Sequence, residues 1–382
     1  MIKFLPSRRW REASSLVIAA RNAENVNGSD YSILLLQRGN TATFAKSHHV
    51  FPGGVLDASD SRSDWLDSFS RILKTDSVTS TMDVLKTTGC SNEVRAPPTF
   101  MRSRAYDEDV QPFGLPAELA FKICSLRETF EESGILLARP ATDTDFKHRL
   151  LDSRGGQPAE MASVVKLSES DRAHWASVVR ADASKFLPMC QALDCVPDVW
   201  STHLWSVWLT PSNAPKRFDT PFFLTVLPEV PDLLVNDAEH QSVRWLRASD
   251  IPASIAAGEV KVGPPQAMEL LRIARHGECS ELLQHAAQRA QEHGSERWCP
   301  LRVRCTDGLI SVFPGDSLYG NFSSGESVDC TMLELISRSQ RVHALLCYSS
   351  TDYRFYCNIP ERRGHLFPVT HDVCPTPVAD AV

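Results

Sequence analysis

The sequence predicts an α/β fold, because short apolar runs of strand length alternate with longer stretches of helical periodicity. Near the N-terminus, residues 13–21 and 31–38 form two such runs with turn residues between them. Further along, a strongly periodic helix begins around Glu118, stops at Gly134 and leads into an extended run up to Pro140. Strands and helices therefore share most of the 382 residues, as they do in an α/β protein.

The first two strands should pair as a hairpin, because the residues between them are typical of turns. These residues include Asn25, Asn27, Gly28 and Asp30. After Gly54 the pattern breaks down, and residues 61–117 mix Ser, Thr, Asp and Pro around one helix-like piece, Trp65–Leu73. We interpret this stretch as an insertion.

The middle of the chain, residues 141–196, should be mostly helical, with an apolar helix around residues 173–190. The strands expected after it are Trp200–Leu209, Pro221–Leu227 and Ser242–Trp245, and the helices are Asp250–Ala257 and Pro264–Gln291. Beyond Trp298 the sequence alternates around the hairpin signal Asp307-Gly308. We therefore expect residues 291–382 to form a small antiparallel β extension that packs on a main domain of residues 1–290.

The composition excludes several classes of protein. Forty basic and 47 acidic residues give a formal net charge of −7, which argues against a general attraction to nucleic acid or to an anionic membrane. No run of about 18 apolar residues occurs, so we expect no membrane span. The 11 cysteines contain no C-x-x-C pair, which indicates reduced thiols in an intracellular protein rather than a disulfide framework or a zinc site.

The N-terminal segment gives a weaker signal about targeting. Arg8, Arg9 and Arg11 precede an apolar stretch, Leu16–Ala20, that is too short for the core of a secretory signal. The arginine and serine content is also that of a mitochondrial transit segment, and this alternative stays open. Glu12 and the strand-like run that follows it favour a folded region instead.

The helix that begins near Glu118 carries the most informative residues. On a helical wheel one narrow stripe is apolar and the other side is acidic: Leu119, Ile123, Leu126 and Phe130 against Glu128, Glu131 and Glu132. We expect the stripe to pack and the acids to face out. Glu128 and Glu132 lie one turn apart, which costs roughly 0.2–0.5 kcal/mol in an isolated helix unless a cation bridges them. Mg²⁺ takes one or two such carboxylates as ligands and leaves its other positions for water and phosphate, so the pair is a candidate metal site. The alternative interpretation is that the three acids form a solvated face of the helix.

Residues 127–135, RETFEESGI, resemble the second half of the Nudix box, R-E-U-x-E-E-x-G-U, where U is apolar. Thr129 stands at one of the apolar positions. The first half, G-x5-E, resembles the segment from Gly54 to Asp60, with Asp in place of Glu and F-P-G before it. The insertion then interrupts the box. This insertion and the phrases WREASSLVIAA, WLTPSNAPKRFDTPFF and VFPGDSLY resemble the acyl-coenzyme A diphosphatases of the nucleoside diphosphate-linked moiety X motif 19 group.

The resemblance implies a Nudix α/β/α sandwich with a mixed sheet. It also implies Mg²⁺ or Mn²⁺ held by Glu128 and Glu132, with Glu131 and Arg127 beside them as catalytic residues. The implied reaction is hydrolysis of the diphosphate of coenzyme A and acyl-coenzyme A to 3′,5′-ADP and (acyl-)4′-phosphopantetheine. Other nucleoside diphosphate derivatives (ADP-ribose, a nucleotide sugar, an RNA cap) and a non-catalytic nucleotide-binding domain stay open as alternatives.

A second motif, L-L-x-x-R-[SA]-x3-R-x3-G-x3-F-P-G-G, is common in Nudix enzymes that act on coenzyme A, and it matches here in part. The residues that fit, besides the leucines, are Arg38, Phe51, Gly53 and Gly54, whereas Gly39, Thr43 and Ser47 do not fit. We expect Arg38 to contact phosphate and the two glycines to let the backbone approach a metal or diphosphate. A surface arginine and an ordinary turn are the alternatives.

The general base is expected outside the box. Glu239, in a loop before the strand that ends at Trp245, is the candidate, with Asp237 and Glu229 as alternatives. Relatives of this group are often peroxisomal or mitochondrial, but the sequence ends in Asp380-Ala381-Val382, which is not a peroxisomal tripeptide.

Three other groups of residues could have either a functional or a structural role. His48 and His49 are adjacent in an extended segment and point to opposite faces, which argues against a shared metal. Trp200, Trp205 and Trp208 are expected in the core rather than as a base-stacking platform. The phrase at residues 217–220, RFDT, is expected either to line the site or to brace it.

Overall fold

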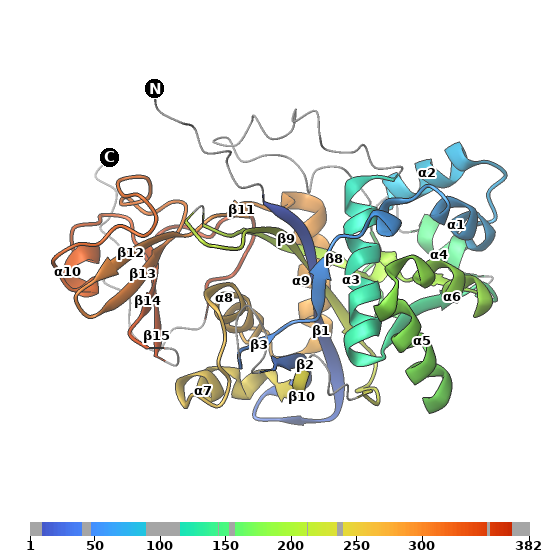
Figure 1. Cartoon of the computed structure of the whole chain (residues 1–382), viewed down its shortest axis with the longest axis horizontal. Coiled ribbons are helices and arrows are strands. Elements are labelled where there is room, and N and C mark those ends of the chain that lie inside the picture. The colour runs from blue at the N-terminus through green and yellow to red at the C-terminus, as the bar shows by residue number, and fades with distance from the viewer. Residues whose placement is uncertain are drawn as a thin grey trace.

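The structure is a computed structural model that describes residues 10–39, 47–88, 115–143, 145–152, 157–211, 213–234, 240–349 and 352–368. A central sheet lies between two helical layers, and a second sheet forms the C-terminal end of the molecule (Figure 1). Within these residues, no helix is both long enough and apolar enough to cross a membrane.

The central sheet is mixed, as the sequence predicts. Its strands are β1 (Arg11–Val26), β2 (Ser29–Arg38), β3 (His49–Val50), β4 (Gly53–Val55), β8 (His203–Leu209), β9 (Phe218–Leu227), β10 (His240–Arg247) and β11 (Arg297–Trp298). They follow the order β10-β2-β1-β9-β8-β11, with β3 attached to β2 and β4 attached to β1. The pairs β1·β9 and β8·β11 are parallel, and the remaining pairs are antiparallel.

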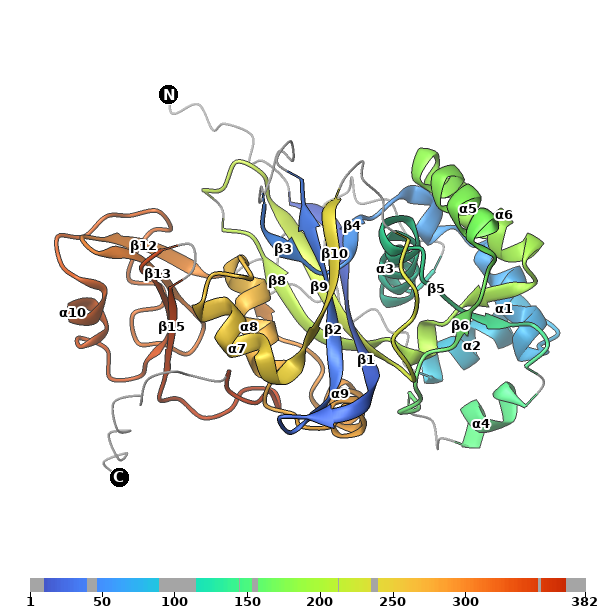
Figure 2. The ribbon, with the colours of Figure 1, turned by 90° about the horizontal axis from the view of Figure 1, so that it is seen from below.

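The two faces of the sheet bury separate apolar cores. Along β1, Leu16 and Ile18 join the core beneath the helix α3 (Ala117–Ser133), whereas Val17 and Ala19 join the core on the opposite side. The second core is covered by the helices α7 (Ile251–Ala256), α8 (Pro264–Ile273) and α9 (Cys279–His293). Figure 2 shows α3 on one side of the strands and α7 and α8 on the other. This two-sided burial explains why β1 and β2 read as nearly continuous apolar runs.

A further helical layer packs around α3. It contains α1 (Trp65–Leu73), α2 (Val78–Thr87), α4 (Phe146–Asp152), α5 (Glu169–Ala181) and α6 (Phe186–Ala192), with the short strands β5 (Leu136–Pro140), β6 (Val164–Val165) and β7 (Cys195–Pro197). The helix predicted at Trp65–Leu73 is present. The single helix expected around residues 173–190 is wrong, because Asp182 takes an extended conformation and its side chain accepts a hydrogen bond from Ser184 N, which starts a new turn.

The prediction of one helix over Pro264–Gln291 is also wrong, because α8 ends at Ile273 and α9 begins at Cys279. Contacts from the N-terminal hairpin stabilise both ends of the break. Tyr31 donates to the carbonyls of Ile273 and His276, and Asp30 accepts from Cys279 N at 2.7 Å. These partners lie more than 240 residues away in sequence, so no local pattern reveals them.

The C-terminal sheet is antiparallel, as expected, and has the order β12-β13-β14-β15. It consists of β12 (Leu301–Cys305), β13 (Gly308–Val312), β14 (His343–Cys347) and β15 (Tyr353–Cys357), and helix α10 (Met332–Ile336) covers it. Phe313 lies against Trp208 and Trp298, with ring centroids 5.9 and 5.5 Å away. Because β11 belongs to the central sheet, that sheet extends past residue 290, and the division at 290 stays a prediction.

Candidate active site

Helix α3 carries the acidic cluster, and its surroundings differ from the expectation. The helix ends at Gly134 in the left-handed conformation (φ 71°), so the glycine stop is present. The prediction that the acids face out is wrong, because Glu131 and Glu132 are each only 8% exposed. One side of α3 packs on the sheet, and the other is covered by α5 and by the short 3₁₀ helix η1 (Ala58–Ser61). A buried cluster of acids needs partners that a solvated face does not.

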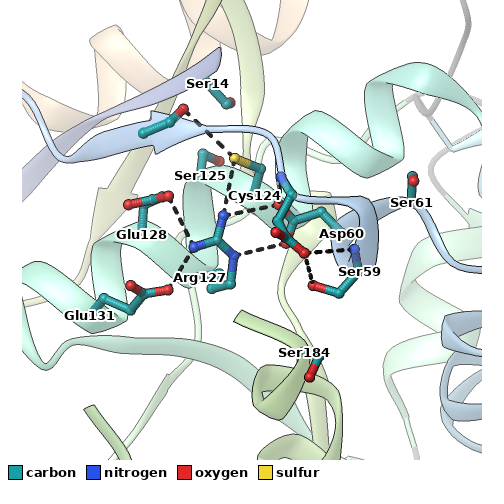
Figure 3. A network of polar contacts seen from close by, with 12 residues as sticks. Ser14, Ser59, Asp60, Ser61, Cys124, Ser125, Arg127, Glu128, Glu131 and Ser184 are labelled. Atoms are coloured by element: carbon teal, nitrogen blue, oxygen red, sulfur yellow. Dashed lines mark hydrogen bonds and ion pairs between the residues drawn. The ribbon is translucent and has the colours of Figure 1, made fainter. Parts of the chain in front are cut away.

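Arg127 is the main partner of the acids, as Figure 3 shows. Its Nε and Nη2 donate to the two oxygens of Asp60 at 2.8 and 3.0 Å. Its Nη1 lies 2.6 Å from Glu131 Oε1 and 2.9 Å from Glu128 Oε1, and Nη2 also approaches the Val55 carbonyl at 3.4 Å. All three nitrogens of the guanidinium are therefore engaged by the protein.

Asp60 is held in place by its own short helix. In η1, Asp57 N donates to Asp60 Oδ2 at 2.9 Å, while the Asp57 side chain accepts from Ser59 N at 2.8 Å. These contacts belong to a capping box that fixes the first turn. Asp60 is 1% exposed, so its bond to Arg127 is shielded from water.

Gly53 and Gly54 bring strand β4 close to the acids. Gly53 N donates to Glu132 Oε2 at 2.9 Å, and a Cβ on Gly54 would lie 2.4 Å from the Glu128 carboxyl group. β4 is fixed by pairing with β1, where Ser14 lies opposite Gly54 and donates through Oγ to the Phe121 carbonyl of α3 at 2.8 Å. Glu128 and Glu132 thus flank one glycine dipeptide, and at Gly54 only a glycine leaves room for the Glu128 carboxyl group where it lies.

The electrostatics of the cluster favour a bound cation. Burial raises the pKa of Glu128 to about 7, and the charges of Glu131 and Asp60 add to this while Arg127 opposes it. Burial also raises the pKa of Glu131, again with Arg127 opposing. A divalent ion would offset the cost of keeping both carboxylates charged away from water.

The residues present fit such an ion in part. Among the described residues, no group of three or more His, Cys, Asp or Glu side chains is arranged as a complete metal site. Mg²⁺ and Mn²⁺ do not need one, because they take one or two carboxylates and complete their shell with water and substrate phosphate. Glu128 and Glu132, placed side by side at the glycine dipeptide, supply that kind of donor set.

The remaining predicted substrate residues fall on different faces of the sheet. Leu34, Leu36 and Arg38 alternate along β2, and Leu34 belongs to the core beneath α3, so Arg38 projects to the α3 side. Its Nε is buried without a partner in the described part of the chain. Phe51 instead packs in the opposite core against Phe222, with ring centroids 6.0 Å apart. The structure therefore does not bring Phe51 together with the acids.

Of the three candidate bases, Glu229 lies in the described part of the chain. Glu239 and Asp237 lie outside the described residues. Glu229 is exposed and pairs with Lys166 Nζ at 3.0 Å. Among the described residues, Glu229 therefore contacts Lys166 at the surface and does not contact the acidic cluster.

The comparisons with known proteins identify the family. A family model described as the NUDT19 Nudix domain matches residues 10–273. The chain belongs to this Nudix family. It is 32% identical over 381 residues to "Acyl-coenzyme A diphosphatase NUDT19" of Gallus gallus, covering 95% of each chain. It is also 32% identical over 382 residues to the Homo sapiens protein of the same name, covering 94% of this chain and 95% of that one.

Two other similar proteins have more general names. "Putative nudix hydrolase 7" of Caenorhabditis elegans is 24% identical over 314 residues, which cover 81% of this chain and 75% of that one. A Nudix hydrolase from Alicyclobacillus acidocaldarius with a solved structure is 20% identical, with a TM-score of 0.48, and the match covers 72% of this chain and 96% of that one. Nudix hydrolases generally use divalent metal ions.

Within the Nudix fold, the other groups singled out in the sequence have structural partners. His49 is buried, and its backbone N donates to the Lys261 carbonyl. Trp205 and Trp208 donate through their indoles to the buried Glu269, both at 2.8 Å, as core residues do. In the RFDT phrase, the Arg217 guanidinium stacks on Trp10 at 4.5 Å, and Asp219 accepts from Arg297 at 3.0 Å. These contacts join the phrase to other parts of the fold and indicate a structural role.

Sequence reasoning missed Arg180 on α5. This arginine donates through Nη2 to the backbone carbonyl of Glu131, at the C-terminal end of the Nudix box helix. Its charge also acts on the Glu131 carboxylate and lowers the pKa of that group against the larger effect of burial. No motif marks Arg180, and only the packing of α5 beside α3 brings it to the site.

Proposed function

We propose that this protein hydrolyses the diphosphate of coenzyme A and acyl-coenzyme A. The observation that carries the proposal is the arrangement at the glycine dipeptide, where Glu128 and Glu132 lie beside Gly54 and Gly53 and Arg127 binds Asp60 and Glu131. The substrate class rests on the similarity, along nearly the whole chain, to proteins named acyl-coenzyme A diphosphatase. The products would be 3′,5′-ADP and 4′-phosphopantetheine or its acyl form.

In this proposal Glu128 and Glu132 hold Mg²⁺ or Mn²⁺. The bound ion would neutralise the diphosphate and lower the pKa of an attacking water. Arg127 keeps Glu131 and Glu128 oriented, and Asp60 fixes the guanidinium from its other side. The backbone N–H of Gly53 orients Glu132. Hydrolysis adds the water oxygen to one phosphorus, and the oxygen that bridged the two phosphorus atoms leaves with the other.

We propose Glu239 as the base that takes the proton from the attacking water, with Asp237 as the alternative in the same loop. The four acids of the cluster already have partners: Glu128, Glu131 and Asp60 bind Arg127, and Glu132 binds Gly53 N. A base from outside α3 therefore suits the site. Glu239→Gln should lower the rate and change the pH profile, and an unchanged profile would assign the role to another residue.

The test is incubation of the purified protein with a panel of nucleoside diphosphate derivatives and Mg²⁺, with products identified by mass. The panel contains coenzyme A, an acyl-coenzyme A, ADP-ribose, a nucleotide sugar and a capped oligonucleotide. Coenzyme A and its acyl form should react fastest, and the products should include 3′,5′-ADP. Glu128→Gln is the matched control for a contaminating activity.

The remaining outcomes separate the alternatives. If ADP-ribose or a capped nucleotide reacts faster, the substrate class is wrong although Nudix chemistry stands. If no panel member turns over with Mg²⁺ or Mn²⁺ and a nucleotide still binds, the chain is a non-catalytic binding domain.

A further inference from the structure

A diphosphate bound at the acidic cluster needs a positively charged side chain in addition to the metal ion that the carboxylates would hold. Asp60, Glu128 and Glu131 surround Arg127, and every nitrogen of that guanidinium is bonded to the protein. Glu132 lies one turn from Glu128 and accepts from Gly53 N. A diphosphate brings further negative charge to this place. Because Arg127 has no donor left in a suitable position, phosphate oxygens must find their donors elsewhere.

Arg180 is the cation that reaches the catalytic helix from outside the Nudix box. It lies in the last turn of α5, which packs beside α3 (Figures 1 and 2). Through Nη2 it donates to the Glu131 carbonyl, in the last turn of α3. That bond fixes one edge of the guanidinium next to the residue that pairs with Arg127.

The rest of the Arg180 guanidinium is available. Its Nε and Nη1 have no bond to any described residue, and the side chain is partly exposed. An arginine held by one nitrogen, with its other donors not bonded to the described residues, is prepared to bind a phosphate through two parallel hydrogen bonds. Its position beside the acids also places its charge where a diphosphate must approach.

Arg172, on the same helix, has a different environment. It donates through Nη1 to the carbonyl of Asp232 at 3.0 Å, and its side chain packs at Gly134, beyond the end of α3. Arg172 is therefore a matched control for Arg180. It has the same charge and lies on the same helix, but it contacts a loop and not the acidic cluster of α3.

We propose that Arg180 is a substrate-binding residue that contacts phosphoryl oxygens of the diphosphate at the acidic site. The inference rests on the proposed hydrolysis for its substrate and extends it to a residue outside the box. Arg180 belongs to the segment after the box, residues 141–196, so this segment would form part of the substrate site as well as support it.

The experiment compares Arg180→Met, Arg180→Lys and Arg172→Met in the full-length protein. It measures KM and kcat for coenzyme A with Mg²⁺, calorimetric binding of α,β-methylene-ADP with Mn²⁺ present, and binding of Mn²⁺ alone by electron paramagnetic resonance. Arg180→Met should raise KM and the Kd of the analogue about ten- to a hundredfold, with Mn²⁺ affinity within about twofold of wild type. Arg180→Lys should lie between, because an ammonium keeps the charge but not the two-point geometry.

Arg172→Met should leave KM and the analogue Kd within about twofold of wild type. The inference is overturned if Arg180→Met behaves in the same way, or if it loses Mn²⁺ binding and thermal stability in proportion to its loss of analogue binding. Should that variant fail to fold, Arg180→Lys decides, and an unchanged analogue Kd overturns the inference. Wild-type protein without turnover would contradict the proposed hydrolysis instead, while analogue binding would still test Arg180.

Discussion

Arg127 and Asp60 lie 67 residues apart in sequence and form a two-point ion pair in the core of the site, with distances of 2.8 and 3.0 Å. The insertion, residues 61–117, lies between these two residues along the chain. The pair therefore joins the two segments that resemble the halves of the Nudix box, although about sixty residues interrupt them. It also ties η1, and through it α1, to helix α3.

Asp60→Asn should destabilise the fold strongly, because it removes the charge of the carboxylate that binds two nitrogens of the buried Arg127. Breaking such a pair costs about 3–5 kcal/mol. The measurement is the shift of the thermal and urea unfolding midpoints. Asp60→Glu keeps the charge and is the conservative control. A midpoint for Asp60→Asn within about 2 °C of wild type would mean that the pair contributes little.

The sequence predicted the parts of the site that local patterns encode. The helix from Ala117 to Ser133 and its stop at Gly134 follow from periodicity and residue preferences, whereas the fit of Gly54 and Asp60 follows from the resemblance to the Nudix box. The burial of the acids could not be predicted in this way, because it depends on η1 and α5 packing on a helix side that looks polar in sequence. Arg180 was missed for the same reason, since its contact with Glu131 exists only after α5 packs.

Glu128→Gln and Glu132→Gln should each lower turnover of coenzyme A at least about a hundredfold, because charge stabilisation by a bound metal is worth several kcal/mol. Both variants should remain folded, since an amide fills the same space as the carboxyl. Activity and circular dichroism together check this, and Glu229→Gln, at an exposed ion pair, serves as the control. Near-normal activity in both variants would contradict the proposal that Glu128 and Glu132 hold the metal ion.

The two glycines of the dipeptide should respond differently to alanine. On Gly53, with φ 153°, a Cβ would lie 2.3 Å from the Ser14 carbonyl and 2.7 Å from Ser15 Cα, so Gly53→Ala should disrupt backbone pairing and lower stability. On Gly54 a Cβ would meet only the end of the Glu128 side chain, within 2.4–2.5 Å, and that side chain can move aside. Gly54→Ala should therefore fold well but lose activity.

Thermal melting and kcat/KM for both glycine variants make this comparison. We expect a reduced melting temperature for Gly53→Ala, and for Gly54→Ala a wild-type melting temperature with a loss of activity of about tenfold or more, because a displaced ligand costs transition-state stabilisation. Equal stability and equal activity in the two variants would contradict the distinct roles inferred from the clashes.

Glu128 should make the stability of the metal-free protein depend on pH. Its pKa is about 7 in the folded protein and 4.5 ordinarily, so the folded state binds the proton more tightly than the unfolded state. The stability that this group contributes is fully present below about pH 4.5 and is lost as the pH rises through about 7. With a chelator present, the melting temperature of wild type relative to Glu128→Gln should fall between about pH 5 and pH 8. A difference that is constant, or that rises with pH, would show that Glu128 is ionised at little cost.

Arg38 should distinguish coenzyme A from its dephospho form. Coenzyme A carries a 3′-phosphate where dephospho-coenzyme A has only a hydroxyl, and Arg38 projects to the α3 side of β2 with a buried Nε that lacks a partner among the described residues. A charge-assisted contact from this group to phosphate is worth roughly 1.5–3 kcal/mol, or about ten- to a hundredfold in kcat/KM. Wild type should therefore prefer coenzyme A by about that factor, and Arg38→Ala should reduce the preference while changing the rate on dephospho-coenzyme A little. The measurement is kcat/KM for both substrates by steady-state kinetics. An equal loss of kcat/KM on the two substrates in Arg38→Ala would place Arg38 at the diphosphate. Equal kcat/KM values in wild type would show that the 3′-phosphate is not recognised.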